Sequence, residues 1–159
     1  MESTLTEIIS EDGKALNLER TISGTVTELT EVGVLNVFYR GLARLPTSTR
    51  NLANLTMLNL NRNKLTQFPD VVLNLINLTH LSVNDNRLST LPANLNYLEK
   101  LQELGLRNNK LKKVFKYIID LNNLEKLSVA GNPLTFQEMR SLMMLMDLKS
   151  QRMLIDIAG

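Results

Sequence analysis

Aliphatic residues recur along the middle of the chain with a period of 23 residues. Each period opens with a stretch in which apolar and polar positions alternate, and the four stretches read LTMLNLNRN, LTHLSVNDN, LQELGLRNN and LEKLSVAGN. Their first residues are Leu55, Leu78, Leu101 and Leu124. Alternation with a period of two predicts a short β-strand in each unit. Self-similarity at a fixed period predicts that the units stack on one another.

Further apolar positions complete each unit. The inward side of the strands is predicted to hold Leu58, Leu60, Leu81, Val83, Leu104, Leu106, Leu127 and Val129. After the strand, the chain is predicted to turn into the core at Leu65, Leu88 and Leu111. The far side of the core is predicted to be closed by Val72, Leu75, Leu95, Leu98, Ile118 and Leu121. Two units carry Phe68-Pro69 or Leu91-Pro92 before this side, whereas the third has Val114-Phe115, so its turn should differ.

All four units share the core L-x-x-L-x-(L/V)-x-x-N-x-L, which resembles the leucine-rich-repeat (LRR) family over residues 32–134. The length and the mid-repeat Leu-Pro pair are similar to the 23-residue class of bacterial and intracellular Ras-binding-type repeats. The resemblance implies an α/β fold: a curved solenoid with a parallel sheet on its concave side and short helical, 3-10 or irregular segments on its convex side. It also implies that Asn63, Asn86, Asn109 and Asn132 point inward and bond loop backbone, a structural ladder rather than a set of ligands.

The pattern decays toward both ends, as terminal repeats usually do. We expect a single domain over residues 1–159, with residues 1–31 forming an N-terminal cap and a degenerate repeat. Arg40 stands where an earlier repeat would have asparagine, Leu16 and Leu18 resemble a strand, and residues 4–9 are predicted to form a helix.

Residues 135–159 are predicted to form the C-terminal cap. Thr135 and Glu138 have the spacing of a capping box that opens a helix. An apolar stripe follows at helical spacing, and we expect it to cover the core of the last repeat; it consists of Phe136, Met139, Leu142, Met143 and Met146. The alternative is a methionine-rich helix that binds a partner. Residues 153–157 are expected to return as a short strand.

The amino-acid composition excludes several kinds of functional site. The chain has no cysteine and a formal net charge of only +2, so disulfides and thiolate sites are excluded and any electrostatic partner must recognise a local patch. The absence of cysteine, of a signal peptide and of a long apolar run favours a cytoplasmic or otherwise intracellular protein without a membrane span.

His80 is the single histidine, and no glycine-rich phosphate loop is present. Glu103 and Lys126 occupy the same repeat position as His80 on the next two units, which predicts a ladder of mixed charge rather than a metal site. We therefore expect no catalytic residue, no metal, no cofactor and no enzymatic activity.

The repeat alignment predicts which side chains face solvent on the concave sheet. Phe38 and Tyr39 are two of seven aromatic residues and fall at such positions, unless residues 1–15 fold over them. Aromatic and arginine side chains are enriched at binding hot spots. The predicted partner-binding residues, with Arg62 and Arg107 flanking the aromatic pair, are Phe38, Tyr39, Met57, Asn61, Arg62, His80, Asn84, Asp85, Glu103 and Arg107.

The sequence thus predicts a monomeric, non-catalytic module that binds another protein on its concave face. One alternative is a scaffolding unit that assembles through its convex or end surfaces, where Phe115, Tyr117 and Ile119 lie. Another is weak binding of an acidic protein or a nucleic acid along the basic rim of Lys64, Arg87 and Lys110. Most runs of this kind are simply solvent-exposed edges that bind nothing. Nucleic acid is not expected, because the rim lacks the interleaved aromatic residues that stack on bases.

Overall fold

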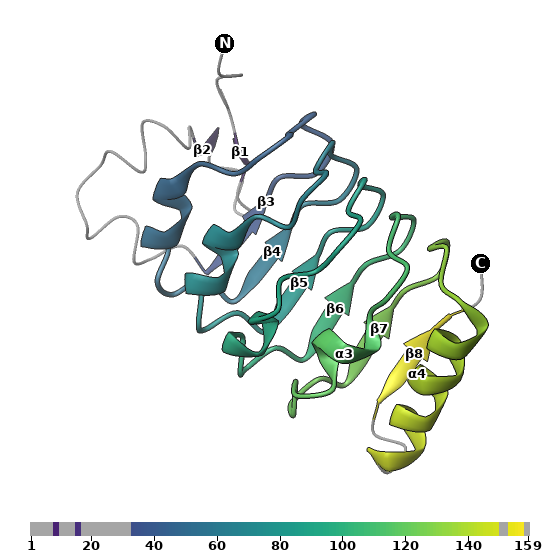
Figure 1. Ribbon diagram of the computed structural model, residues 1–159. Coiled ribbons are helices and arrows are strands. Elements are labelled where there is room, and N and C mark those ends of the chain that lie inside the picture. The colour runs from purple at the N-terminus through teal and green to yellow at the C-terminus, as the bar shows by residue number, and fades with distance from the viewer. Residues whose placement is uncertain (1–7, 10–14, 17–32, 150–152, 158–159) are drawn as a thin grey trace.

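The computed structural model of the chain describes residues 8–9, 15–16, 33–149 and 153–157. In these residues one sheet has the strand order β2-β1-β3-β4-β5-β6-β7-β8 (Figure 1). The strands are β1 (Ile8–Ile9), β2 (Ala15–Leu16), β3 (Val34–Asn36), β4 (Met57–Asn59), β5 (His80–Ser82), β6 (Glu103–Gly105), β7 (Lys126–Ser128) and β8 (Leu154–Asp156). The connecting helices are η1 (Thr47–Asn51), η2 (Asp70–Asn74), η3 (Leu95–Tyr97), α3 (Phe115–Ile118) and α4 (Phe136–Leu148).

From β3 to β8 every pair of neighbouring strands is parallel, and from β3 to β7 the partners are one repeat period of 23 residues apart. The last pair differs, because Lys126 of β7 pairs with Leu154 of β8, which follows the longer α4 segment. Met57 pairs with His80, His80 with Glu103, and Glu103 with Lys126. The 3-10 and α-helical segments line up on the opposite side of the rod (Figure 1). The α/β leucine-rich-repeat solenoid is therefore confirmed, including the final strand after α4.

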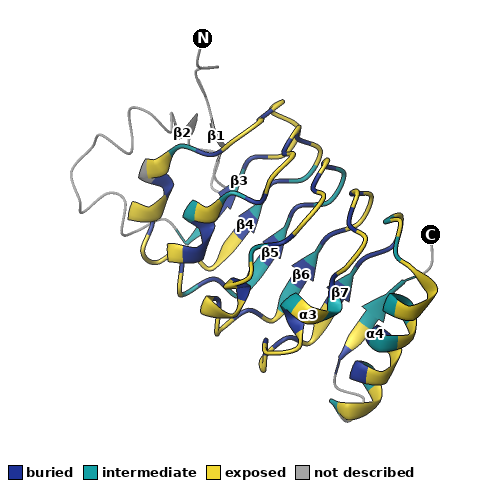
Figure 2. Ribbon diagram, viewed as in Figure 1, coloured by how far each residue is buried: buried dark blue, intermediate teal, exposed yellow. Residues whose placement is uncertain are grey.

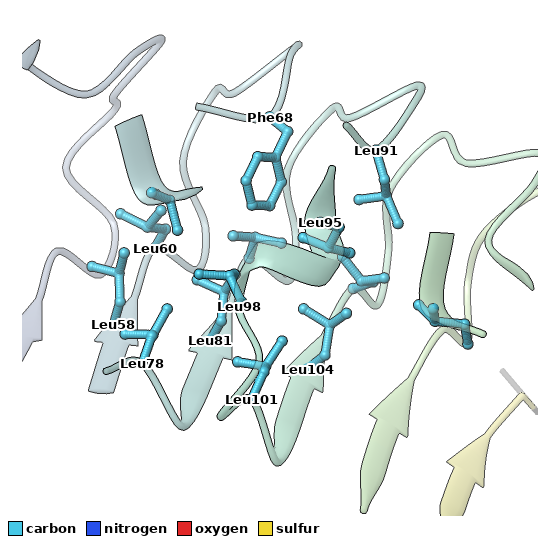
Figure 3. Packing of buried hydrophobic residues seen from close by; sticks show 14 of the residues in the cluster. Leu58, Leu60, Phe68, Leu78, Leu81, Leu91, Leu95, Leu98, Leu101 and Leu104 are labelled. Carbon is cyan, nitrogen blue, oxygen red and sulfur yellow. The ribbon is translucent and has the colours of Figure 1, made fainter. Parts of the chain in front are cut away.

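The core lies between the sheet and the helical segments. Figure 3 shows leucines from successive repeats packed in layers, with Phe68 and Leu91 at the same place in neighbouring units. Leu60, Leu65, Leu75, Leu78 and Leu98 are fully shielded from solvent. Burial of one such side chain contributes about 1.5–3 kcal/mol, so the repeated core is the main source of stability.

The unit without a Leu-Pro pair has a different convex segment, as predicted. Val114 takes the buried position of Phe68 and Leu91, and the chain then forms the α-helix α3 instead of a 3-10 helix. Ile118 is fully buried, Phe115 and Tyr117 pack half-buried against the core, and Ile119 is exposed.

Helix α4 begins at the predicted place, but only one half of the capping box is present. The Thr135 hydroxyl accepts a hydrogen bond from the Glu138 backbone N–H at 3.2 Å. The Glu138 carboxylate instead accepts hydrogen bonds from the backbone N–H groups of Val114 and Phe115, at the start of α3. Glu138 therefore links α4 to the preceding repeat by satisfying donors that a helix start leaves unpaired.

The predicted apolar stripe of α4 is partly wrong. Leu142 is buried, but Phe136 is 79% exposed and Met143 56% exposed, and the second buried residue is Leu145. The inward face includes Glu138, Leu142, Leu145 and Lys149, which recur at helical spacing, and Met139 and Met146 of the predicted stripe are half-buried. Figure 2 shows this division of the helix into a buried and an exposed side.

Lys149 anchors the other end of that face. Its ammonium group donates a hydrogen bond to the Leu121 carbonyl. Desolvation lowers the pKa of Lys149, and the nearby charge of Asp120 partly opposes this. Charged residues can therefore occupy the inward face because each one pairs with backbone groups of the adjacent repeat.

The N-terminal predictions need correction where residues are described. Ile8 and Ile9 form β1 rather than a helix, and Ile9 pairs antiparallel with Asn36 of β3. Two adjacent β-branched residues favour a strand, and β3 offers them a free edge. Leu16 does belong to a strand, but β2 pairs antiparallel with β1 and is not a further parallel repeat. Leu18, Val32 and the rest of residues 17–32 lie outside the described residues.

Candidate functional site

The concave face is formed by two columns of outward side chains. One column holds Val34, Met57, His80, Glu103, Lys126 and Leu154, and the other holds Asn36, Asn59, Ser82, Gly105, Ser128 and Asp156. Small residues in the second column leave an open hollow of about 370 Å³ along the middle of the sheet. The first column changes from apolar at the N-terminal end to charged farther along.

The charged part of this column forms a ladder centred on Glu103. Its carboxylate accepts a hydrogen bond from Lys126, and its Oε1 lies 3.7 Å from His80 Nε2. The hydrogen bond and the negative charge of Glu103 raise the pKa of Lys126, so this lysine stays cationic. Glu103 therefore already has protein partners on both sides, which fits a surface ladder better than a catalytic carboxylate.

An aromatic–cationic cluster occupies the N-terminal end of the same surface. The Phe38 and Tyr39 ring centroids are 6.3 Å apart, and the Arg62 guanidinium carbon lies 5.4 Å from the Phe38 centroid. Phe38 is 43% exposed, Tyr39 is 74% exposed, and Met57 is 39% exposed on the neighbouring strand. Phe38, Tyr39 and Arg62 thus share one solvent-facing patch, whereas Met57 lies on the same face at the first residue of β4, among the residues that line the central hollow.

The remaining charged residues of the predicted set lie in two separate places. Asp85 joins the N-terminal cluster, because its Oδ2 lies 3.8 Å from Arg62 Nε and its Oδ1 accepts a hydrogen bond from Asn108 at 2.7 Å. Arg107 does not flank the aromatic pair. It follows β6, three strands away, and its Nη1 lies 3.3 Å from Oδ2 of Asp156, the last residue of β8.

The cluster includes residues from a repeat position at which the backbone adopts the left-handed conformation. Tyr39, Arg62, Asp85 and Asn108 have φ between 52° and 55°, and Gly131 follows with φ 72°. Asn, Asp and Gly tolerate this region, whereas other L-residues lose about 1–2 kcal/mol there. Tyr39 and Arg62 are therefore held in a costly conformation at the point where the surface is most aromatic, and such strain often accompanies function.

Asn61 and Asn84, which the sequence placed among the binding residues, have their side-chain oxygens occupied within the fold. Asn61 Oδ1 accepts hydrogen bonds from the Asn84 backbone N–H and the Ser82 hydroxyl, both at 2.7 Å. Asn84 Oδ1 accepts from the Arg107 backbone N–H at 2.7 Å. A Cβ at Gly105 would come within 2.8 Å of Ser82 Oγ, so glycine there leaves room for this network. Asn61 and Asn84 occupy the same position in successive repeats. This recurrence is the feature of the sequence that could have indicated a hydrogen-bond network between repeats.

The asparagines of the predicted ladder are also bonded to backbone. The Asn86 side-chain amide donates to the carbonyls of Leu60 and Val83, at 2.9 and 3.0 Å, and its oxygen accepts from the Leu65 N–H at 3.1 Å. Asn63, Asn109 and Asn132 make the corresponding bonds in the other repeats. Each amide therefore connects its own turn to the turn of the preceding repeat.

The described part of the chain contains neither a metal-binding cluster nor a membrane-spanning helix. No group of three or more His, Cys, Asp or Glu side chains that could hold a metal ion occurs there. No helix in the same residues is long and apolar enough to cross a membrane.

Comparisons with known proteins agree with this architecture. The family described as Leucine Rich Repeat matches residues 54–75 and 77–98. No curated protein matches the chain. The Leu-Pro subclass is compatible with these findings and stays a prediction.

Two solved structures illustrate the similarity. An LRR protein of Leptospira interrogans is 33% identical, with a TM-score of 0.73 over 83% of this chain, and the chain spans only 33% of that protein. The LRR ectodomain of the receptor kinase SOBIR1 from Arabidopsis thaliana is 27% identical, with a TM-score of 0.58 over 79% of this chain and 68% of the ectodomain.

Proposed function

Because the chain is a leucine-rich-repeat protein, we propose that it is a non-catalytic interaction module whose protein partner docks on the concave face at its N-terminal end. Proteins of this family typically mediate protein–protein interaction and are generally non-catalytic. The surface proposed for docking consists of Phe38, Tyr39, Met57, Arg62 and Asp85, and is called the concave cluster below.

The observation that carries this proposal is the exposed stack of Phe38, Tyr39 and Arg62. An aromatic ring and an arginine that lie in contact at the surface are the residue types that dominate binding energy at interfaces. Tyr39 and Arg62 also keep a left-handed backbone, which glycine, asparagine or aspartate would adopt at lower cost. A surface that is both apolar and conformationally costly is better explained by a binding role than by stability alone.

The rigidity of the sheet supports the same role. Phe38 and Tyr39 lie two and three residues after the end of β3, and the Tyr39 backbone N–H donates a hydrogen bond to the Asn61 carbonyl at 3.0 Å. Arg62 is fixed in the same way by the Asn84 carbonyl, at 2.9 Å. Because the backbone of the concave cluster is ordered before binding, little conformational entropy is lost on docking.

The experiment uses two substitutions at one position. Once affinity capture from the source organism and mass spectrometry have identified the partner, dissociation constants are measured for Arg62→Ala and Arg62→Gly. We expect both to weaken binding about tenfold, because both lose an interface arginine. The glycine variant should be about 1 kcal/mol more stable than the alanine variant, since only alanine keeps the penalty of positive φ.

This pair separates a loss of binding from a loss of folding, because the more stable variant should still bind poorly. Tyr97→Ala is the control: Tyr97 is 59% exposed on η3, on the convex side, and its loss should leave affinity unchanged. Wild-type affinity in both Arg62 variants would show that the partner docks elsewhere.

A second candidate, a scaffolding unit, is favoured by the outer side of α4. Phe136, Met143, Met144 and Leu148 are exposed there, and Leu154 is exposed on β8, the last strand of the sheet. Apolar surface at the end of a solenoid can pair with a second copy of the chain. Recovery of only the chain itself in the capture experiment would favour this candidate.

A further inference from the structure

We propose that a second surface, the edge formed by the turns after β3, β4, β5 and β6, binds an acidic helical segment of a protein. This surface, called the basic edge, consists of residues 40–46, 63–69, 86–92 and 109–115. It lies beside the concave face. Its charge, the spacing of its cations and an adjoining hollow support this role, which does not depend on the function proposed for the concave cluster.

Charge is segregated on the basic edge although the whole chain is nearly neutral. The chain has 18 Lys and Arg against 16 Asp and Glu. The four segments of the edge contain no acidic residue. Their cationic residues are Arg40, Arg44, Lys64, Arg87, Lys110, Lys112 and Lys113. The edge therefore presents a local positive field that the net charge conceals.

Three of these cations form a regular column. Lys64, Arg87 and Lys110 occupy one repeat position and are all exposed. The backbone N–H groups of Lys64 and Arg87 donate to carbonyls of the preceding turns, those of Leu42 and Leu65, at 2.7 and 2.8 Å. Neighbouring turns are thus fixed at about the 4.8 Å spacing of adjacent strands, and three like charges are held one above another.

Among the described residues, no side chain supplies a counter-charge to this column. No ion pair or side-chain hydrogen bond of Lys64, Arg87 or Lys110 occurs among the described residues. Of the nearby carboxylates, Asp85 is occupied by Arg62 and Asn108. Glu138 accepts from the backbone at the start of α3. Like charges stacked in register are unfavourable, so an external anion would relieve a repulsion that the folded chain retains.

The column also borders a hollow that can receive side chains. Tyr39, Lys64, Asp85 and Arg87 are among the residues that line this open space of about 550 Å³. Two of the unpaired cations thus face a depression rather than a flat surface. An acidic side chain placed there would contact Lys64 and Arg87 together.

The spacing of the column indicates which anion fits. Three neighbouring turns span about 10 Å, two steps of about 4.8 Å. Carboxylates at positions i, i+4 and i+7 of an α-helix lie on one face and span about 10.5 Å, at about 1.5 Å per residue. A helix with such a stripe, lying along the rod, can pair one carboxylate with each cation. Nucleic acid fits less well, since Phe68 is buried and Phe115 half-buried, which leaves the edge without a row of aromatic rings for base stacking.

The test uses two fluorescein-labelled, alanine-rich peptides of equal composition. One carries three glutamates at i, i+4 and i+7, and the other spreads them around the helix at i, i+2 and i+5. Fluorescence anisotropy measures the binding of each peptide, and of oligothymidylate, to the full chain. The edge variant is Lys64→Glu with Arg87→Glu and Lys110→Glu.

A matched variant carries the same change in net charge on the convex side: Arg50→Glu with Lys116→Glu and Arg140→Glu, all at exposed positions. A thermal melt checks that each variant is folded. If the triple edge variant is not folded, the single variant Arg87→Gln replaces it in the binding measurement.

We expect the striped peptide to bind about tenfold more tightly than the spread peptide, and the edge variant to lose about tenfold or more of that affinity. Arg87→Gln should lose part of it, the convex variant should bind as the wild type does, and added salt should weaken binding. Equal losses in the edge and convex variants, equal affinity for the two peptides, or tighter edge-dependent binding of oligothymidylate would each overturn the proposal. Neither variant changes a side chain of the concave cluster. Binding of a partner to the concave cluster can therefore be measured independently of peptide binding to the basic edge.

Discussion

Removal of all residues from Thr135 onward should abolish the cooperative unfolding of the whole domain. The deletion removes three buried side chains, Leu142, Leu145 and Met153, and it exposes Leu127 and Val129 at the last remaining strand. Truncation of one large buried residue costs about 2–5 kcal/mol, and a domain of this size has only about 5–15 kcal/mol in total. The deleted protein should aggregate or melt without a sharp transition in circular dichroism.

The control for this deletion is a change on the exposed side of α4. Phe136→Ser with Met143→Ser alters apolar residues that do not contact the core, so its melting curve should match that of the wild type. A truncated chain that stays monomeric and melts as the full chain does would show that α4 and β8 do not complete the core.

Asn86→Ala should lower the free energy of unfolding by about 1–3 kcal/mol, the cost of leaving a buried polar group without its partner. The group most affected is the Leu65 N–H, which donates to Asn86 Oδ1. The Leu60 and Val83 carbonyls each accept from a second ladder asparagine, Asn63 and Asn109 respectively, so they lose only part of their bonding. Urea denaturation followed by circular dichroism measures the difference.

Arg40 is the natural control for Asn86, because it occupies the same repeat position one unit before Asn63. Its side chain is exposed, and its backbone N–H donates to Asn63 Oδ1 whatever the side chain is. Arg40→Ala should therefore change stability by no more than about 0.5 kcal/mol. Equal losses at Arg40 and Asn86 would be incompatible with a ladder that begins at Asn63.

The middle of the molecule was predictable because every repeat meets the same surroundings. A residue of β5 touches its counterparts on β4 and β6, so the period of 23 residues alone determined the register of His80 and Glu103. The burial of Leu81 and Leu104 followed from alternation in the same way. Because each repeat stacks on the next, residues that are one period apart in the sequence become neighbours in space.

The ends were not predictable by this route, since an end residue has a neighbour on only one side. Ile8 and Ile9 follow a helix-like spacing in the sequence but pair with the free edge of β3. On α4, apolarity alone favoured Phe136 and Met143 for the inward face, whereas Glu138 and Lys149 occupy it because they bond unpaired backbone groups of the repeat that contains α3.

Within the candidate site, the repeat pattern indicated which positions face solvent. It did not indicate which of the side chains there are already hydrogen-bonded within the fold. Asn61 and Asn84 were grouped with Phe38 and Tyr39 because they share a repeat position or adjoin it. Their amides serve the backbone of the next repeat, which only the geometry reveals. The left-handed conformation of Tyr39 and Arg62 was equally hidden, because neither residue type favours positive φ.

Site-specific photo-crosslinking tests the central claim, that a protein partner docks on the concave cluster, most directly. A benzophenone amino acid replaces either Tyr39, 74% exposed beside β3, or Tyr97, 59% exposed on the convex side, and each protein is irradiated with the purified partner. Docking on the concave cluster predicts a crosslinked product from position 39 and none above background from position 97. Crosslinking from position 97 alone would contradict it and place the partner on the convex side of the rod.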